Sequence, residues 1–143
     1  MAYSKILMAI DSSEYSFASA ERGFELAHQL NAKVALIFVI DAARTIHSAD
    51  SGILPEETIV VLKKEAEQTL NQISKMFNGE DLTKFMPEGH PAEDIIKTAE
   101  VWGADLIIMG TYGRAGLMHL LSGSVAESVI RNSKIPVMVV PSK

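Results

Sequence analysis

Four residues in the second half of the chain have the types and spacing that suit a phosphate group. Gly110, Gly113, Gly123 and Ser124 form the pattern G-x-x-G, nine further residues and then G-S. Glycine permits a positive φ and a close approach of the backbone to a ligand, and the first turn of a helix presents unpaired N–H groups at the positive end of its dipole. We therefore expect a strand, loop and helix whose loop binds an anion, above all phosphate.

The same residues also have a purely structural interpretation. Neither the P-loop pattern G-x-x-x-x-G-K-[ST] nor the dinucleotide pattern G-x-G-x-x-G is present. Gly110 would then end a strand, and Gly113 and Gly116 would shape turns. Ser124 and Glu127 would form a capping box at the start of a helix. The spacing alone does not choose between the two interpretations.

A carboxylate, Asp11, follows the first apolar run, residues 5–10. That run predicts a strand buried on both faces, and the pattern from Glu14 onward predicts an amphipathic helix. Asp11 is either the N-cap of this helix, with Glu14 completing a D-x-x-E variant of the capping box, or a ligand for a ribose hydroxyl at the carboxyl end of the strand. The roles are compatible because one carboxylate oxygen can cap while the other faces a ligand.

The elements that must position these residues follow from the hydrophobic pattern along the chain. Five strands alternating with helices predict a single α/β domain over residues 1–143, with a parallel sheet and helices on both faces. Gly23, inside the first helix, predicts a close approach of helix to sheet, because glycine costs about 1 kcal/mol there relative to alanine. The further strands are expected at residues 33–40, 83–87, 105–109 and 135–140, and the further helices at 56–78, from 91 and from 124.

Two segments have open interpretations. The polar stretch 41–55 is either a lid over the carboxyl edge of the sheet or a surface loop without a binding role. The last strand is either covered within the monomer or an apolar edge that pairs with a second chain. We expect a homodimer through this strand, formed by Pro136, Val137, Met138, Val139 and Val140.

The composition excludes several classes of function. With a net charge of -5 and a pI near 5.3, the chain lacks the basic surface of a nucleic-acid-binding protein. It has no cysteine, and its 4 histidines have no ligand spacing, so we expect no metal site built by the protein. No segment has the length of a membrane span or the pattern of a signal peptide, and we expect a cytoplasmic protein.

Five motifs together cover essentially the whole chain: KILMAID-SS, LIFVID, GHPAEDII, ADLIIMGTYGRAGL and GSVAESVIRNSKIPVMVVP. In combination they resemble the universal stress protein family. This resemblance implies a Rossmann-like fold of the adenine nucleotide alpha-hydrolase type, with an open five-stranded parallel sheet of order 3-2-1-4-5. It also implies dimerisation through the last strand, in agreement with the pattern of residues 135–140.

The complete G-x-x-G-x9-G-[ST] pattern resembles that of the ATP-binding branch of the family. The resemblance implies that the motif residues bind the phosphates of ATP and that Mg²⁺ is bound through these phosphates. Asp11 would hold the ribose or lie beside the adenine, and the backbone of Val39 would meet the adenine edge. The implied ATP-binding residues are Ala9, Asp11, Val39, Met109, Gly110, Gly113, Arg114, Gly123, Ser124 and Val125.

The leading expectation is an ATP-binding stress-response protein that regulates an unidentified protein partner. One alternative is weak ATP hydrolysis or phosphate transfer, for which Glu127 and His119 are the candidate bases; no catalytic residue is assigned. The stretch D-S-S-E-Y-S also departs from the S-G-G-x-D-S of adenylating relatives of the fold. The other alternative is a nucleotide-independent dimeric interaction module. Glu127 is expected to point away from the phosphates, to cap Ser124, or to be offset by a divalent ion.

Overall fold

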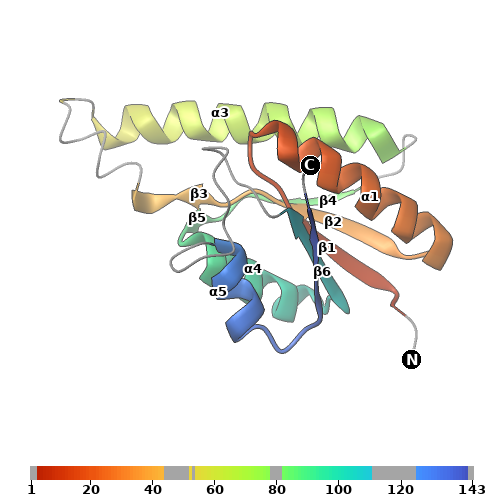
Figure 1. The fold of residues 1–143 in the computed structure, drawn as a ribbon. Coiled ribbons are helices and arrows are strands. Elements are labelled where there is room, and N and C mark those ends of the chain that lie inside the picture. The colour runs from red at the N-terminus through yellow and green to blue at the C-terminus, as the bar shows by residue number, and fades with distance from the viewer. Residues whose placement is uncertain (1–2, 44–51, 53, 78–81, 111–124, 142–143) are drawn as a thin grey trace.

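Five parallel strands form the centre of the molecule, and helices cover both faces of the sheet (Figure 1). This computed structural model describes residues 3–43, 52, 54–77, 82–110 and 125–141. The strands of the central sheet are β1 (Lys5–Ala9), β2 (Lys33–Ile37), β4 (Thr83–Phe85), β6 (Leu106–Gly110) and β7 (Val137–Val140). The helices are α1 (Glu14–Leu30), α3 (Pro55–Ser74) with the 3-10 turn η1 (Lys75–Phe77), α4 (Pro91–Trp102) and α5 (Val125–Asn132).

The strand order is β4-β2-β1-β6-β7, and every neighbouring pair is parallel. Counting only the strands of this sheet, the order is 3-2-1-4-5, so the predicted fold class is confirmed. In the register, Leu7 of β1 lies opposite Ala35 of β2 on one side and Ile107 of β6 on the other. The first strand of the chain is therefore the central strand of the sheet.

Side chains of β1 pack alternately on the two helical layers. Ile6 and Met8 belong to the apolar cluster beneath α1 and α3, whereas Leu7 belongs to the cluster beneath α4 and α5. All three are at most 1% exposed. Successive side chains of a strand point to opposite faces, so a strand covered on both faces needs a continuous apolar run.

The close approach predicted at Gly23 is present where α1 crosses β1. A Cβ atom placed on Gly23 would lie 2.8 Å from Sδ of Met8 and 3.4 Å from Cδ1 of Ile108. Any side chain at this position would therefore push α1 away from the sheet or displace buried atoms.

The second predicted strand, residues 33–40, is not continuous. β2 ends at Ile37, and β3 (Ile40–Asp41) pairs instead with β5 (Glu88–Gly89) in a separate two-stranded sheet that the sequence analysis did not anticipate. The N–H groups of Phe38 and Ile40 donate to the carbonyls of Phe85 and Pro87, at 3.0 and 2.8 Å. The chain therefore leaves β1 after Ile37 and follows the β4–β5 segment.

Other predicted boundaries shift by a few residues. The helix predicted at 56–78 is α3 followed by η1, and the last strand begins at Val137 rather than at residue 135. Of the polar stretch 41–55, residues 44–51 and 53 lie outside the described part of the chain. The lid interpretation of that stretch therefore stays a prediction.

Candidate nucleotide site

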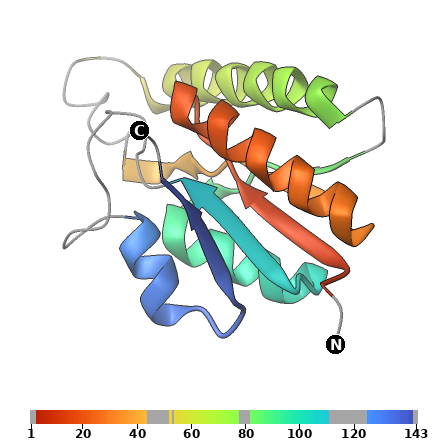
Figure 2. The same ribbon diagram turned by 45° about the vertical axis from the view of Figure 1, so that its right-hand side comes forward.

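Adjacent strands β1 and β6 send the chain to opposite faces of the sheet. β1 leads into α1, which packs on the face that also holds α3, whereas the segment after β6 leads to α5 on the face that holds α4 (Figure 2). In open parallel sheets, ligands bind outside the carboxyl ends of the strands at such a switch point. Asp11 follows β1 and Gly110 ends β6, so both lie at this edge.

The carboxylate of Asp11 uses only one of its oxygens within the described structure. Oδ1 accepts hydrogen bonds from the N–H of Ser13 at 2.9 Å, from the Ser13 hydroxyl at 2.5 Å and from the Ser16 hydroxyl at 2.9 Å. Oδ2 has no hydrogen bond to any described residue. Because a carboxylate oxygen is an acceptor only, Oδ2 is suited to a ligand that brings a hydroxyl or N–H donor.

The N-cap interpretation of Asp11 is wrong. α1 begins at Glu14 with Ser13 as its N-cap, and the Ser13 side chain makes no capping hydrogen bond. The Ser13 hydroxyl instead donates to Asp11, whose side chain also accepts from the backbone two residues further on, as in an Asx turn. Asp11 therefore organises the turn before the helix rather than the first helical turn.

The predicted apolar site residues that the structure describes share one face of the sheet. Met109 is 5% exposed and belongs to the cluster beneath α4 and α5, and Ala9, Val39 and Val125 are half-buried against the same cluster. These residues come from β1, from the segment after β2, from β6 and from α5. The fold thus gathers an apolar floor on the α4–α5 face, next to the carboxyl ends of the central strands.

Only part of the predicted phosphate motif can be placed. Gly110 is the last residue of β6 and lies opposite Val140 of β7 in the register. Gly113, Arg114, Gly123 and Ser124 lie outside the described residues. α5 begins at Val125, immediately after the G-S of the motif, so its first turn follows the predicted phosphate loop.

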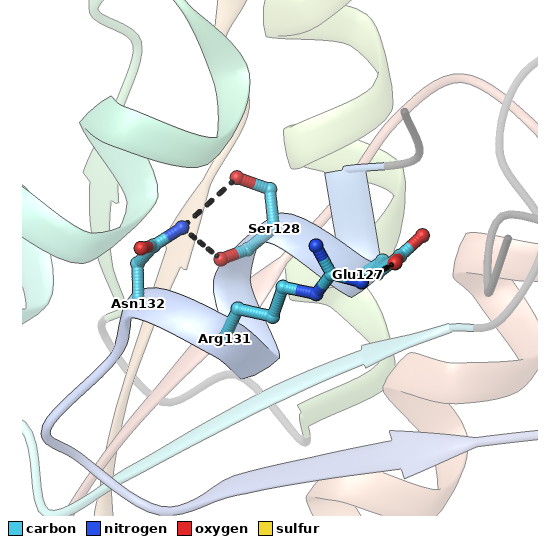
Figure 3. A network of polar contacts seen from close by, with 4 residues as sticks. All are labelled: Glu127, Ser128, Arg131 and Asn132. Atoms are coloured by element: carbon cyan, nitrogen blue, oxygen red, sulfur yellow. Dashed lines mark hydrogen bonds and ion pairs between the residues drawn. The ribbon is translucent and has the colours of Figure 1, made fainter. Parts of the chain in front are cut away.

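Glu127, in the first turn of α5, forms an ion pair within its own helix. Its Oε1 lies 2.6 Å from Nη2 of Arg131, one turn further along (Figure 3). The Glu127 side chain is 17% exposed and that of Arg131 is 72% exposed. Next to the pair, Nδ2 of Asn132 donates to the carbonyl of Ser128 at 2.8 Å. Arg131 therefore places a positive charge beside the carboxylate in the first turn of α5.

Sequence reasoning did not single out the serines that hold Asp11. Ser13 and Ser16 follow Asp11 by two and five residues in D-S-S-E-Y-S. The available signal was this spacing, because hydroxyls just before and inside a first helical turn can reach back to a preceding carboxylate.

The described residues contain no group of three or more His, Asp and Glu that could hold a metal ion, and none of their helices is long and apolar enough to cross a membrane.

Comparison with known proteins identifies the family. Universal stress protein MJ0531 of Methanocaldococcus jannaschii is 38% identical over 140 residues, which cover 96% of this chain and 82% of that protein. Universal stress protein MJ0577 of the same organism is 33% identical over 156 residues, covering 99% and 96%. The solved structure of MJ0577 matches with a TM-score of 0.84 at 32% identity, over 100% of this chain and 99% of that chain.

A universal stress protein in complex with cAMP matches with a TM-score of 0.70 over 100% of both chains, and at 21% identity this likeness concerns the fold alone. A sequence model of the universal stress protein family matches residues 2–141. This chain therefore belongs to the universal stress protein family.

Proposed function

We propose that the protein binds ATP across the carboxyl ends of β1 and β6 and acts as a nucleotide-dependent regulator in the stress response. The observation that carries this proposal is Asp11 at the switch point, with Oδ1 held by Ser13 and Ser16 and Oδ2 left for a ligand. The hydroxyls of a ribose are donors of the kind that Oδ2 requires. A bound adenine would rest on the apolar floor to which Ala9 and Val39 belong.

The phosphates would extend from Gly110 toward the first turn of α5. The G-x-x-G-x9-G-[ST] pattern spans this interval, and a helix start favours negative charge. The Glu127–Arg131 ion pair supports the assignment because Arg131 places a positive charge beside a carboxylate that would otherwise repel phosphate. Mg²⁺ is proposed to bind through the phosphate oxygens. The resemblance to the ATP-binding branch supports ATP as the nucleotide.

We further propose that the protein acts as a dimer through β7. This strand pairs with β6 on one side and is an edge strand of the described sheet. The N–H of Ile107 donates to the carbonyl of Pro136 at 2.9 Å, which orients the Pro136 carbonyl toward β6. Backbone groups alternate in direction along a strand, so those of Val137 and Val139 point toward the open edge, where a second chain can pair.

A hydrolytic role has less support. A general base must be within reach of the attacking water and able to take its proton. Glu127, a candidate base, has its Oε1 in an ion pair with Arg131. The other candidate, His119, lies outside the described residues.

Calorimetric titration with ATP and magnesium tests the nucleotide site. We expect the wild type to bind after copurifying nucleotide has been removed, Asp11→Ala to weaken binding about tenfold or more, and Gly123→Val to abolish it. Glu25→Ala is the matched control, because Glu25 is an exposed carboxylate on α1. Absence of binding by the wild type, or equal loss in Asp11→Ala and Glu25→Ala, would refute the proposal.

A further inference from the structure

Ser16 is a buried serine whose hydroxyl makes both of its hydrogen bonds with Asp11. It accepts from the Asp11 N–H at 2.7 Å and donates to Asp11 Oδ1 at 2.9 Å. Ser16 is 6% exposed and lies in the first turn of α1. A serine hydroxyl has a single proton to donate, so the bond to Oδ1 uses all of its donor capacity.

The position of Ser16 is itself fixed by its neighbours. Its N–H donates to the carbonyl of Ser13 at 3.2 Å, and its carbonyl accepts from the hydroxyl of Ser19 at 3.1 Å. Ser19 is 3% exposed, so this support is also buried. The hydroxyl of Ser16 is therefore held on a rigid part of the fold.

The bonds of Ser16 constrain Asp11 at both its backbone and its side chain. Rotation of the carboxylate would exchange Oδ1 and Oδ2 only after three hydrogen bonds to Oδ1 had been broken. The Ser13 hydroxyl bonds to the same oxygen but not to the Asp11 N–H. Of the two serine hydroxyls, only that of Ser16 therefore bonds to both the backbone and the side chain of Asp11. Fixing an acceptor before the ligand arrives lowers the entropic cost of binding.

We propose that Ser16 is a positioning residue for nucleotide recognition, which keeps Oδ1 of Asp11 engaged so that Oδ2 receives the ribose hydroxyls. This inference rests on the proposed ATP site and adds to it a determinant of ribose selectivity. Ser16 does not contact the ligand. It acts through Asp11, so its contribution to binding disappears when the Asp11 carboxylate is absent.

A double-mutant cycle separates this role from a merely structural one. Ser16→Ala is expected to weaken ATP binding about fivefold in the wild-type background and less than about twofold in an Asp11→Ala background. A serine that only stabilises α1 would change the dissociation constant by the same factor in both backgrounds. Ser74→Ala is the control, since the Ser74 hydroxyl also donates to a backbone carbonyl, that of Asn71 at the end of α3, and has no bond to Ser16 or Asp11; we expect unchanged binding.

The second readout is the ratio of affinities for ATP and 2′,3′-dideoxy-ATP. Ser16→Ala is expected to reduce the wild-type preference for ATP, whereas Ser74→Ala is expected to retain it. Circular dichroism monitors folding of each variant. If Ser16→Ala does not fold, Ser13→Ala tests the same oxygen from a half-buried position, with a smaller loss of preference expected because the Ser13 N–H remains.

The outcomes distinguish this inference from the proposed function. If the wild type does not bind ATP, both fail together. If the wild type binds ATP but the effect of Ser16→Ala is equal in both backgrounds, or the preference for ATP is unchanged in the folded variant, the positioning role is overturned and the nucleotide site stands.

Discussion

The carboxylate of Asp105, just before β6, joins that strand to the residue preceding β1. Its Oδ2 accepts from the N–H of Ser4 at 2.8 Å, from the Ser4 hydroxyl at 2.9 Å and from the N–H of Lys5 at 2.9 Å. Lys5 in turn donates from Nζ to the carbonyl of Trp102 at 2.6 Å and lies over its ring. The amino ends of two strands that are far apart in sequence are thereby tied together.

This arrangement predicts an acid-dependent stability. The hydrogen bonds from Ser4, followed by that from Lys5, hold the pKa of Asp105 below its ordinary value of 3.8. A carboxylate with a lowered folded pKa stabilises the fold above its unfolded pKa, and this contribution is lost as the pH falls through the folded pKa. Asp105→Asn should therefore be less stable than the wild type at neutral pH, with the difference shrinking in acid below pH 3.8.

Urea unfolding midpoints measured from about pH 3 to about pH 7 check this expectation. Glu25→Gln is the control, because Glu25 is an exposed carboxylate on α1. A constant difference between wild type and Asp105→Asn across this range would contradict the assignment.

Gly23 and Met8 predict a background-dependent effect of alanine. Alanine at Gly23 gains about 1 kcal/mol in helix propensity but overlaps Met8, and overpacking of a core costs about 1–3 kcal/mol. We expect Gly23→Ala to lower the free energy of unfolding by about 1 kcal/mol in the wild type. In a Met8→Val background the same change should be neutral or stabilising. Thermal and urea unfolding of the four chains measures both effects, and an equal loss in both backgrounds would show that Met8 is not the obstacle.

The open edge of β7 predicts a backbone-specific effect on association. Val139→Pro removes an N–H that faces away from β6, so we expect the sheet to persist and the dimer dissociation constant to rise at least about tenfold. Val139→Thr keeps the N–H and the branched shape and is the matched control. Sedimentation velocity over a concentration series measures association. Dimerisation of Val139→Pro equal to that of Val139→Thr would place the interface elsewhere.

The ion pair in α5 predicts a salt-dependent effect on nucleotide affinity. Arg131→Gln removes the positive charge that lies beside the Glu127 carboxylate, and we expect ATP binding to weaken about twofold to threefold at low salt and less at high salt. Adding Glu127→Gln should restore affinity. Lys134→Gln removes an equal charge from an exposed residue outside the helix and should have a smaller effect. Calorimetry at two salt concentrations measures the ATP affinity of each variant. If the double variant does not regain the wild-type affinity, charge compensation by Arg131 is excluded.

Hydrophobic pattern was sufficient to place the strands of the central sheet, because a strand such as β1 that is covered on both faces must be apolar throughout. The order of the strands in the sheet was predicted from the family resemblance, because the spacing of strands along a chain does not determine which of them are neighbours. The break after Ile37 was missed because Phe38 and Val39 continue the apolar run. What ends β2 there is a change of hydrogen-bonding partner, which depends on the position of Phe85 in space.

The candidate site was predictable to a similar extent. The place of Asp11 after a central strand followed from patterning and the strand–helix order. The different roles of its two carboxylate oxygens, one hydrogen-bonded and one available to a ligand, could not be predicted from the sequence. They depend on the side-chain rotamers of Ser13 and Ser16. Glu127 was recognised as a charge near the phosphate loop, but its partner Arg131 was not identified.

The central place of β1 has a consequence for the order of events during translation. β1 is made first. β2 then pairs with one of its edges and β4 pairs with β2, but the other edge of β1 pairs with β6, whose residues 106–110 leave the ribosome much later. Until then the backbone edge of an apolar strand stays open, and such edges pair readily with other chains. The interval between synthesis of β4 and of β6 is thus the stage at which the nascent chain most needs protection from aggregation.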